Sequence, residues 1–162
     1  GKGELAIVTS ARLVQFYRHI LEDYDRLQFG YSAIKLVAKA SDTVDEPEWY
    51  ELLSEVLKGL DVLTIPLALV QAWFYLQYAA LLGHELNVSR TIDGEKFSAD
   101  GQYKYDVSEQ GLRATETGEL TGEHIKLLRL LTTKPLSVLV QIGGIGPILP
   151  ECLFVARSHA AV

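Results

Sequence analysis

The sequence predicts a mainly α-helical fold, a helical bundle with one N-terminal strand and a small β-rich insertion. Apolar residues recur at steps of three and four through most of the chain, which is the spacing of one face of a helix. Residues 87–117 differ, because they contain turn dipeptides and a short alternating run typical of strands. Of the 162 residues, 48% are hydrophobic and 22% are charged, which suffices to fill the core of one ordinary soluble domain.

Charge and cysteine content exclude several classes of protein and site. The chain has 15 Lys and Arg against 21 Asp and Glu, so its net charge is −6. An acidic chain attracts DNA phosphates poorly, so binding of nucleic acid would need a local basic patch. Cys152 is the single cysteine, which excludes a disulfide within the chain and disfavours a zinc site built from several cysteines. We therefore expect a reducing, cytoplasmic setting.

The N-terminal residues predict one strand. Residues 5–9 (LAIVT) form a β-branched run, and Ser10 follows where an N-cap would open a helix. The chain starts at Gly1 and contains no methionine, so we expect a fragment of a longer protein. The first residues lack the charged and long apolar regions of a secretory signal.

Three helices are predicted to follow. The first covers residues 20–40, and its apolar face consists of Ile20, Tyr24, Leu27, Tyr31, Ile34 and Ala38. The second starts near Pro47 and continues through Trp49 to Leu60, loosened or ended by Gly59. The third covers residues 65–83, which contain no charge, with Thr64 as its cap. Gln71 and Gln77 within it, and acidic flanks, favour a central core helix over a membrane span.

The second half of the chain predicts the insertion and the closing helices. Asp93-Gly94 and Asp100-Gly101 are turn signals, and residues 102–107 (QYKYDV) alternate as a strand does. Thr121 caps the next helix, which breaks at Lys134-Pro135. Short helices over 136–142 and 148–159 follow, joined by the glycine-rich residues 143–147. The predicted divisions are 1–10 (strand), 11–86 (bundle, first part), 87–120 (insertion) and 121–162 (closing helices).

No motif in the chain predicts catalysis. Residues 143–147 lack the spacing of a phosphate loop, and the four histidines are scattered. Cys152 lies in an apolar context, where a free cysteine usually behaves as a small buried hydrophobe. These observations argue against an enzyme, a metal site or a bound cofactor. One alternative stays open, a small α-helical enzyme in which folding brings His84 or His124 beside a carboxylate.

Three stretches of sequence, in this order, resemble the RecO recombination mediators over nearly the whole chain. LAIVTSARLVQFYRHILEDYDRLQFGYSAIKLV resembles the last strand of an OB-fold running into the first bundle helices. The family's "D-x-x-R-L…Y" pattern falls there on Asp23, Arg26, Leu27 and Tyr31. WFYLQYAALLGHELNV resembles the long core helix ending in "L-L-G-Y", with Leu81, Leu82 and Gly83 at matching places, and HIKLLRLL resembles the closing helices. Many relatives carry paired CxxC motifs in the insertion, whereas residues 86–117 here have no cysteine, so the β-rich insertion takes the place of the zinc module.

The resemblance implies a non-enzymatic factor that acts on DNA damage, in DNA repair and recombination, and is cytoplasmic and nucleoid-associated. Family members bind DNA, promote strand annealing, and act with RecR and single-stranded-DNA-binding protein to load RecA. In the family, DNA contacts lean on the OB domain, so the helical region is expected to dock partner proteins. A groove with a basic rim would suit the acidic, Phe-ended tail of single-stranded-DNA-binding protein. Charge and helical context, not a motif, nominate the rim residues, which are Arg26, Lys35, Lys39, Lys126 and Arg129. A helical protein-interaction module unrelated to repair is the other alternative.

Overall fold

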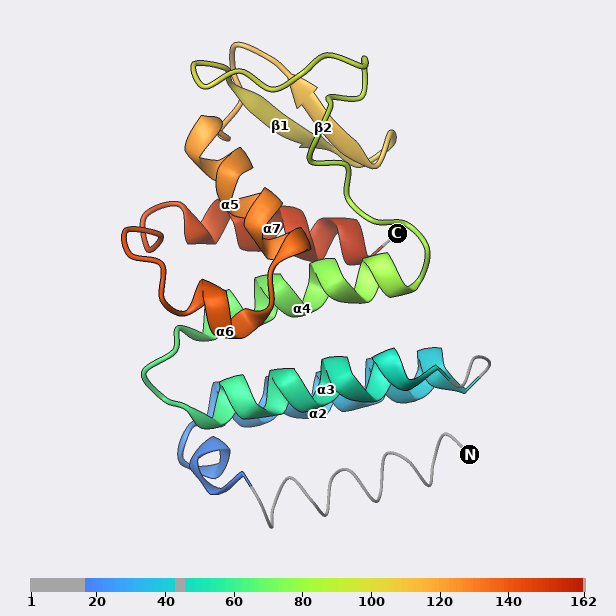
Figure 1. The fold of residues 1–162 in the computed structure, drawn as a ribbon, viewed down its shortest axis with the longest axis vertical. Helices are drawn as coiled ribbons and strands as arrows, with labels where there is room; N and C mark the ends of the chain where they lie inside the picture. Colours follow the sequence, from blue (N-terminus) through green and yellow to red (C-terminus); the bar gives the residue numbers. More distant parts are fainter. Residues whose placement is uncertain (1–16, 43–45, 162) are drawn as a thin grey trace. The chain divides into compact units, whose positions relative to one another are not determined.

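The computed structural model describes residues 17–42 and 46–161. It confirms a mainly helical fold with a small antiparallel sheet (Figure 1). The predicted strand over 5–9 and the Ser10 cap lie outside the described residues. The described elements are η1 (Arg18–Glu22), α2 (Tyr24–Ser41), α3 (Pro47–Asp61), α4 (Leu67–Leu81), β1 (Tyr103–Asp106), β2 (Gly111–Ala114), α5 (Gly122–Thr133), α6 (Leu136–Leu139) and α7 (Leu149–Ala160).

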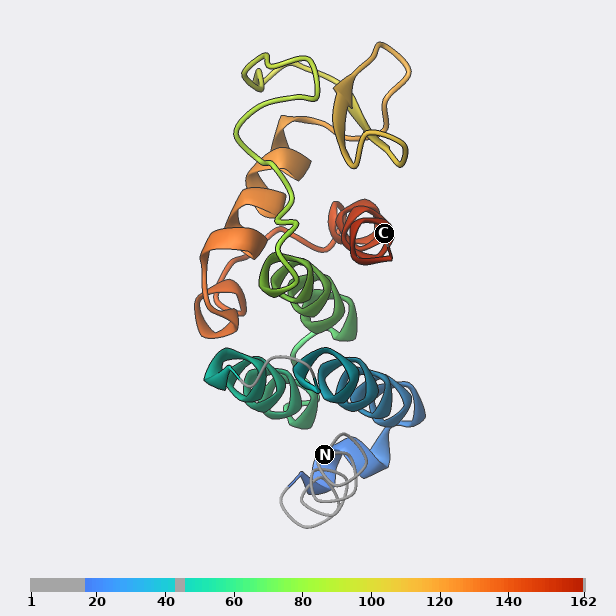
Figure 2. The ribbon, with the colours of Figure 1, turned by 90° about the vertical axis from the view of Figure 1, so that its right-hand side faces the viewer.

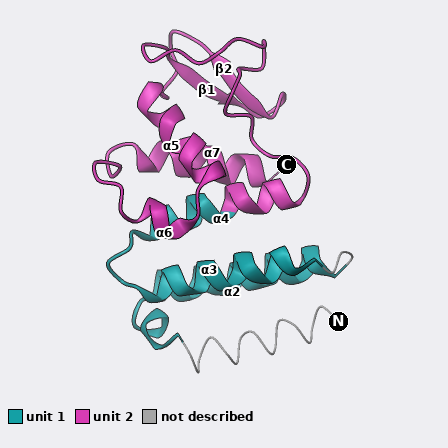
Figure 3. Ribbon diagram, in the orientation of Figure 1, with its two compact units in different colours: residues 1–74 teal, residues 75–162 magenta. Residues whose placement is uncertain are grey.

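The chain forms two compact units, residues 1–74 and residues 75–162 (Figure 3). The division falls within α4, so this helix contributes to both. The insertion and the closing helices belong to the second unit. The four divisions expected from the sequence stay predictions.

In the first unit, α2 and α3 lie side by side and run in opposite directions (Figures 1 and 2). Asp23 caps α2 by accepting a hydrogen bond from the Arg26 backbone N–H at 3.1 Å, and Pro47 occupies the first turn of α3. The buried face of α3 is the one that the sequence predicts. It consists of Trp49, Leu52, Leu53, Val56, Leu57 and Leu60.

The face predicted for the first helix is partly wrong. Ile20 is buried, but it lies in η1, and Tyr24 is 72% exposed at the start of α2. Leu27 and Tyr31 are half-buried. Ile34 and Ala38 are buried, as predicted, and the other buried positions of α2 are Arg26, Phe29, Gly30, Ala33 and Val37. The buried face therefore lies on the side of the helix away from Tyr24.

The predicted start of the third helix is also wrong. Thr64 does not cap α4, which begins at Leu67 after Pro66. The physical reason is Arg26, whose guanidinium takes the carbonyls of Leu63 and Ile65 and so holds this stretch as a non-helical connection. None of the described helices is long and apolar enough to cross a membrane.

In the second unit, β1 lies within the alternating run 102–107, which predicts a strand, and it forms an antiparallel hairpin with β2, with Tyr105 opposite Leu112. Asp106 fastens its turn, because one carboxylate oxygen accepts from the Glu109 N–H at 3.0 Å and the other from Arg113 Nε at 3.0 Å. These contacts hold the pKa of Asp106 below its ordinary value, the backbone bond most strongly. Gln110 in the turn has a φ of 54°, a left-handed conformation that glycine adopts more easily.

The other turn and helix signals of this unit are mostly confirmed. Gly94 N–H donates to Thr91 O at 2.9 Å and Gly101 N–H to Ser98 O at 3.1 Å, so both Asp-Gly pairs lie in turns. α5 ends at Thr133, just before Lys134-Pro135. Helix α6 is shorter than the predicted helix over 136–142. At Gln141 the backbone N–H bonds the carbonyl three residues earlier, that of Val138, so the chain no longer follows the α-helical pattern.

Candidate functional site

Arg26 does not lie on the surface, where a docking rim would need it. Its side chain is buried, with the residue only 4% exposed. The guanidinium donates to Leu60 O at 3.0 Å, to Val62 O at 3.3 Å and to Leu63 O at 3.3 Å, and it also bonds Ile65 O. Five donors in a planar fork suit such a cluster of carbonyls. Arg26 therefore joins α2 to the connection between α3 and α4, and its donors are used within the protein.

Lys35 and Lys39 are exposed and share one side of α2. With 3.6 residues per helical turn, positions 24, 28, 31, 35 and 39 fall within about a quarter of the helix circumference. Tyr24 is 72% exposed, and Tyr31 is half-buried. The helix thus presents aromatic rings toward its N-terminus and ammonium groups toward its C-terminus. We call this surface the α2 stripe; its members are Tyr24, Gln28, Tyr31, Lys35 and Lys39.

Lys126 and Arg129 are exposed on α5, in the second unit, and both already have partners. Lys126 Nζ lies 3.3 Å from Glu123 Oε1, and an Arg129 guanidinium nitrogen donates to Val88 O at 3.1 Å. A ligand of Lys126 must compete with the Glu123 carboxylate. Of the five nominated residues, Arg26 is buried, and the other four divide between the two units, Lys35 and Lys39 in the first and Lys126 and Arg129 in the second.

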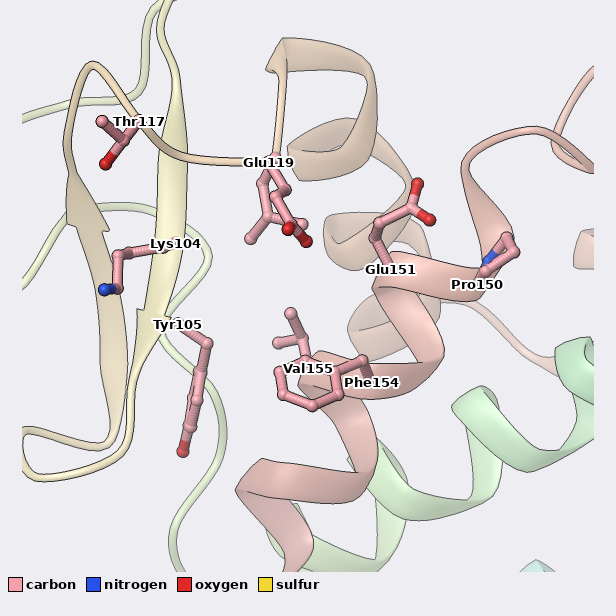
Figure 4. Close-up of a pocket in the computed structure, with 9 residues that line it drawn as sticks. Lys104, Tyr105, Thr117, Glu119, Pro150, Glu151, Phe154 and Val155 are labelled. Atoms are coloured by element: carbon pink, nitrogen blue, oxygen red, sulfur yellow. The ribbon is translucent and has the colours of Figure 1, made fainter.

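A pocket of about 550 Å³ lies between the hairpin and α7, within the second unit (Figure 4). Its floor is apolar, since Leu120 and Val155 are almost fully buried. Phe154, by contrast, is 64% exposed. None of the five nominated residues lines this pocket. Its apolar and aromatic lining consists of Tyr105, Leu120, Pro150, Phe154 and Val155.

The polar lining of the pocket is more acidic than basic. It comprises Lys104 from β1, Thr117 and Glu119 from the connection to α5, and Glu151 from α7. Lys104 and Glu119 are both exposed. The pocket lining thus contains one ammonium group and two carboxylates, whereas the sequence predicts a docking groove with a cationic rim.

The hairpin is fastened to α7 by a buried tyrosine and histidine. Tyr105 Oη lies 2.8 Å from His159 Nδ1, and His159 Nε2 lies 2.6 Å from His84 O. A carbonyl only accepts, so Nε2 carries the proton and Nδ1 accepts from the tyrosine hydroxyl. Burial lowers the pKa of His159, which favours the neutral ring that this arrangement requires. The centroid of the His159 ring lies 5.3 Å from the centroid of the His84 ring. The buried Nε2 of His84 has no hydrogen-bond partner in the described part of the chain.

His124 has a carboxylate within reach, as the enzyme alternative asks, but both its ring nitrogens are occupied. Nδ1 accepts from the Thr121 backbone N–H at 3.0 Å, so His124 takes the part that Glu or Gln plays in a capping box. Nε2 donates to Glu151 Oε1 at 2.8 Å. His124 is 5% exposed and is not part of the pocket lining. The pair holds α5 against α7 and presents no free base to a substrate.

Cys152 is buried, as its apolar context predicts, and its thiol donates to His124 O at 3.6 Å. Burial, with a smaller contribution from the Glu151 charge, raises the pKa of Cys152 to about 12. Such a thiol is protonated at neutral pH and is a poor nucleophile. Among residues 17–42 and 46–161, no group of three or more His, Cys, Asp or Glu could hold a metal ion.

Sequence reasoning misses the exposure of Phe154 in the pocket and the burial of Arg26, although the sequence holds a signal for each. On a helix that turns 100° per residue, Phe154 points away from Cys152 and Val155, so it is an apolar residue on the polar side. In the same way Arg26 shares a face with Phe29, Ala33 and Val37, which predicts burial despite its charge. That the hairpin and α7 meet is a long-range contact, and no local pattern reports it.

A family model described as "Recombination protein O C terminal" matches residues 21–153. This range covers most of the chain, including α2 and all of the pocket lining except Phe154 and Val155. A search among curated proteins found no match, and neither did a search among solved structures.

Proposed function

Because the chain belongs to the family of recombination protein O C-terminal regions, we propose that it serves DNA repair and recombination as a docking module for partner proteins. Family membership carries the role in repair and recombination, and the family acts as a mediator and not as an enzyme. Two histidines support this choice, because both are buried and hold elements together. His124 bonds Glu151 between α5 and α7, and His159 bonds Tyr105 between α7 and the hairpin.

The α2 stripe is the surface that supports docking best. Tyr31 lies about one turn and Tyr24 about three turns before Lys35, and the lysines are four residues apart, so aromatic and cationic groups follow one another along the helix. Neither lysine takes part in an ion pair with another described residue. Solvated cations beside exposed rings make a surface that can receive carboxylates and an aromatic side chain together.

The occupant we propose is the acidic, Phe-ended tail of single-stranded-DNA-binding protein. Its phenylalanine would pack against Tyr24 and Tyr31, while its carboxylates would meet the ammonium groups of Lys35 and Lys39. Among the large hydrophobic side chains of the described residues, that of Tyr24 has the highest exposed fraction. An aromatic partner that packs on Tyr24 therefore removes apolar surface from water. Lys126 and Arg129 on α5 form the second candidate position, with weaker support because each already has a partner.

RecR and RecA are the further partners in this proposal. Docking of the tail would bring the module to single strands coated by single-stranded-DNA-binding protein, where loading of RecA and strand annealing take place. Net charge of −6 supports recruitment through a protein and not through DNA phosphates.

Fluorescence anisotropy with a labelled tail peptide tests the proposal. We expect saturable binding that weakens at higher salt, is lost when the terminal phenylalanine is deleted, and falls about tenfold in Lys35→Ala/Lys39→Ala. Lys58→Ala is the matched control, because Lys58 is an exposed lysine on the neighbouring helix α3.

Two results would change the proposal in different ways. A loss confined to Lys126→Ala/Arg129→Ala would keep the function and move the docking surface to α5. Absence of binding at high protein concentration would remove the tail as a partner of this module.

A further inference from the structure

The pocket between the hairpin and α7 is a preformed surface that the tail docking described above does not use. Its walls are tied together within the second unit. Tyr103 on β1 exchanges backbone hydrogen bonds of 2.8 and 2.9 Å with Leu120, Tyr105 bonds His159, and Glu151 bonds His124. A ligand therefore meets walls that need little ordering, which lowers the entropic cost of binding.

Apolar surface in the pocket is available to a ligand. Phe154 is the most exposed phenylalanine of the described residues at 64%, and it lies beside the buried Val155 (Figure 4). The buried Leu120 also lines the pocket. An exposed aromatic ring over an apolar floor is the arrangement found at the centres of protein interfaces. A leucine or phenylalanine side chain fits this place.

The charge of the pocket selects the rest of the ligand. His124 accepts at Nδ1 and donates at Nε2, so its ring is neutral and leaves the Glu151 carboxylate negatively charged. Glu119 is exposed and takes part in no ion pair with another described residue. Only Lys104 opposes these two carboxylates in the lining. An acidic ligand meets repulsion here, and a basic one meets attraction.

We propose that this pocket docks a short segment of a partner protein in which apolar residues alternate with Lys or Arg. The apolar side chain covers Phe154, and the cationic one lies between Glu119 and Glu151. The surrounding insertion adds to this preference, because residues 87–120 hold seven acidic and four basic residues. This partner differs in charge from the acidic tail and binds a different unit, so the module has two docking surfaces of opposite preference.

The test uses the whole chain and an amidated probe peptide, acetyl-Gly-Leu-Arg-Phe-Arg-Gly-amide, followed by two-dimensional ¹H–¹⁵N NMR. We expect saturating shifts of the amides of Lys104, Leu120 and Val155, which weaken as salt is raised. Phe154→Ala should reduce the affinity about fivefold to tenfold. Phe154 is exposed, so this variant keeps the fold.

A charge exchange makes the test specific. Glu119→Lys should weaken the arginine probe about tenfold and strengthen, by a similar factor, a probe in which glutamate replaces arginine. Glu109→Lys changes the net charge equally at the exposed hairpin turn and should alter neither affinity more than about twofold. Equal binding of both probes by the wild type, or shifts confined to residues outside the pocket, would overturn the proposal. Lys35→Ala/Lys39→Ala should leave the arginine probe unaffected, so failure here is distinct from failure of tail docking.

Discussion

Arg26 is the residue on which the first unit depends most for its polar contacts. A buried charge is costly unless its hydrogen bonds are made. Here one carbonyl near the end of α3 and three in the connection to α4 make them. The Asp23 carboxylate, 3.7 Å from Arg26 Nε, adds a partly exposed counter-charge. One side chain thereby fixes a reversal of the chain that no helix or strand stabilises.

Arg26→Met is expected to lower the free energy of unfolding by about 3 kcal/mol, because it leaves buried carbonyls without donors. Arg26→Lys should lose less, since one ammonium group can reach some of the carbonyls but not all. Urea unfolding followed by circular dichroism measures the difference. Lys35→Met on the exposed side of the same helix should change stability by less than about 0.5 kcal/mol. Equal effects of Arg26→Met and Lys35→Met would contradict the role given to Arg26.

At the scale of elements, the attachment of the hairpin to α7 depends on the protonation of His159. Burial holds its pKa below the ordinary histidine value of 6.5, so the folded protein favours the neutral ring. The contribution to stability is complete above pH 6.5 and declines as the pH falls below it toward the folded pKa, because the unfolded state then binds more protons.

His159→Gln separates this effect from other titrations. A glutamine amide can donate to His84 O and accept from Tyr105 Oη without titrating. Wild type should therefore lose stability relative to His159→Gln between pH 7.5 and pH 5.5, by at most about 1.4 kcal/mol per pH unit. Urea midpoints of both proteins at the two pH values provide the measurement. Parallel pH profiles would show that His159 contributes nothing to the pH dependence.

Elements with strong local signals could be predicted from the sequence, and those set by distant contacts could not. Pro47 and the apolar spacing of α3, or Thr121 and the Lys134-Pro135 break around α5, act within a few residues, so the sequence reports them. The start of α4 depends on Arg26, which is more than thirty positions away. The predicted face of the first helix is wrong at Tyr24, because an aromatic residue counts as apolar in the periodicity, whereas Tyr24 is 72% exposed.

At the scale of the whole molecule, charge limits direct contact with nucleic acid. Net charge is −6, and Lys126, Arg113 and Arg26 are already paired with carboxylates. We expect this chain to bind a 30-nucleotide single strand without saturation below about 100 µM, with a shallow dependence on salt. Fluorescence anisotropy at several salt concentrations gives both quantities. Micromolar affinity with a steep salt slope would reveal a basic patch and contradict this expectation.

The candidate surfaces were less predictable than the fold for the same physical reason. Exposure of Lys35 and Lys39 follows from the helical pattern alone, and both were nominated from it. The pocket requires β1 and α7 to meet across more than forty residues, and its acidic character arises only when Glu119 and Glu151 come together. Family resemblance carried the role in recombination, which neither charge nor spacing could supply.

Helix α4 also bears on how this protein can change in evolution. Domains are exchanged between genes most readily where the joint is an exposed linker with few contacts. Here the division between the units falls inside a hydrogen-bonded helix, and Phe74 and Leu76 on either side of it are fully buried. A break there would expose both side chains and create two uncapped helix ends. We therefore expect the two units to be inherited together, with new partners gained by substitution on the surfaces and not by replacement of a unit.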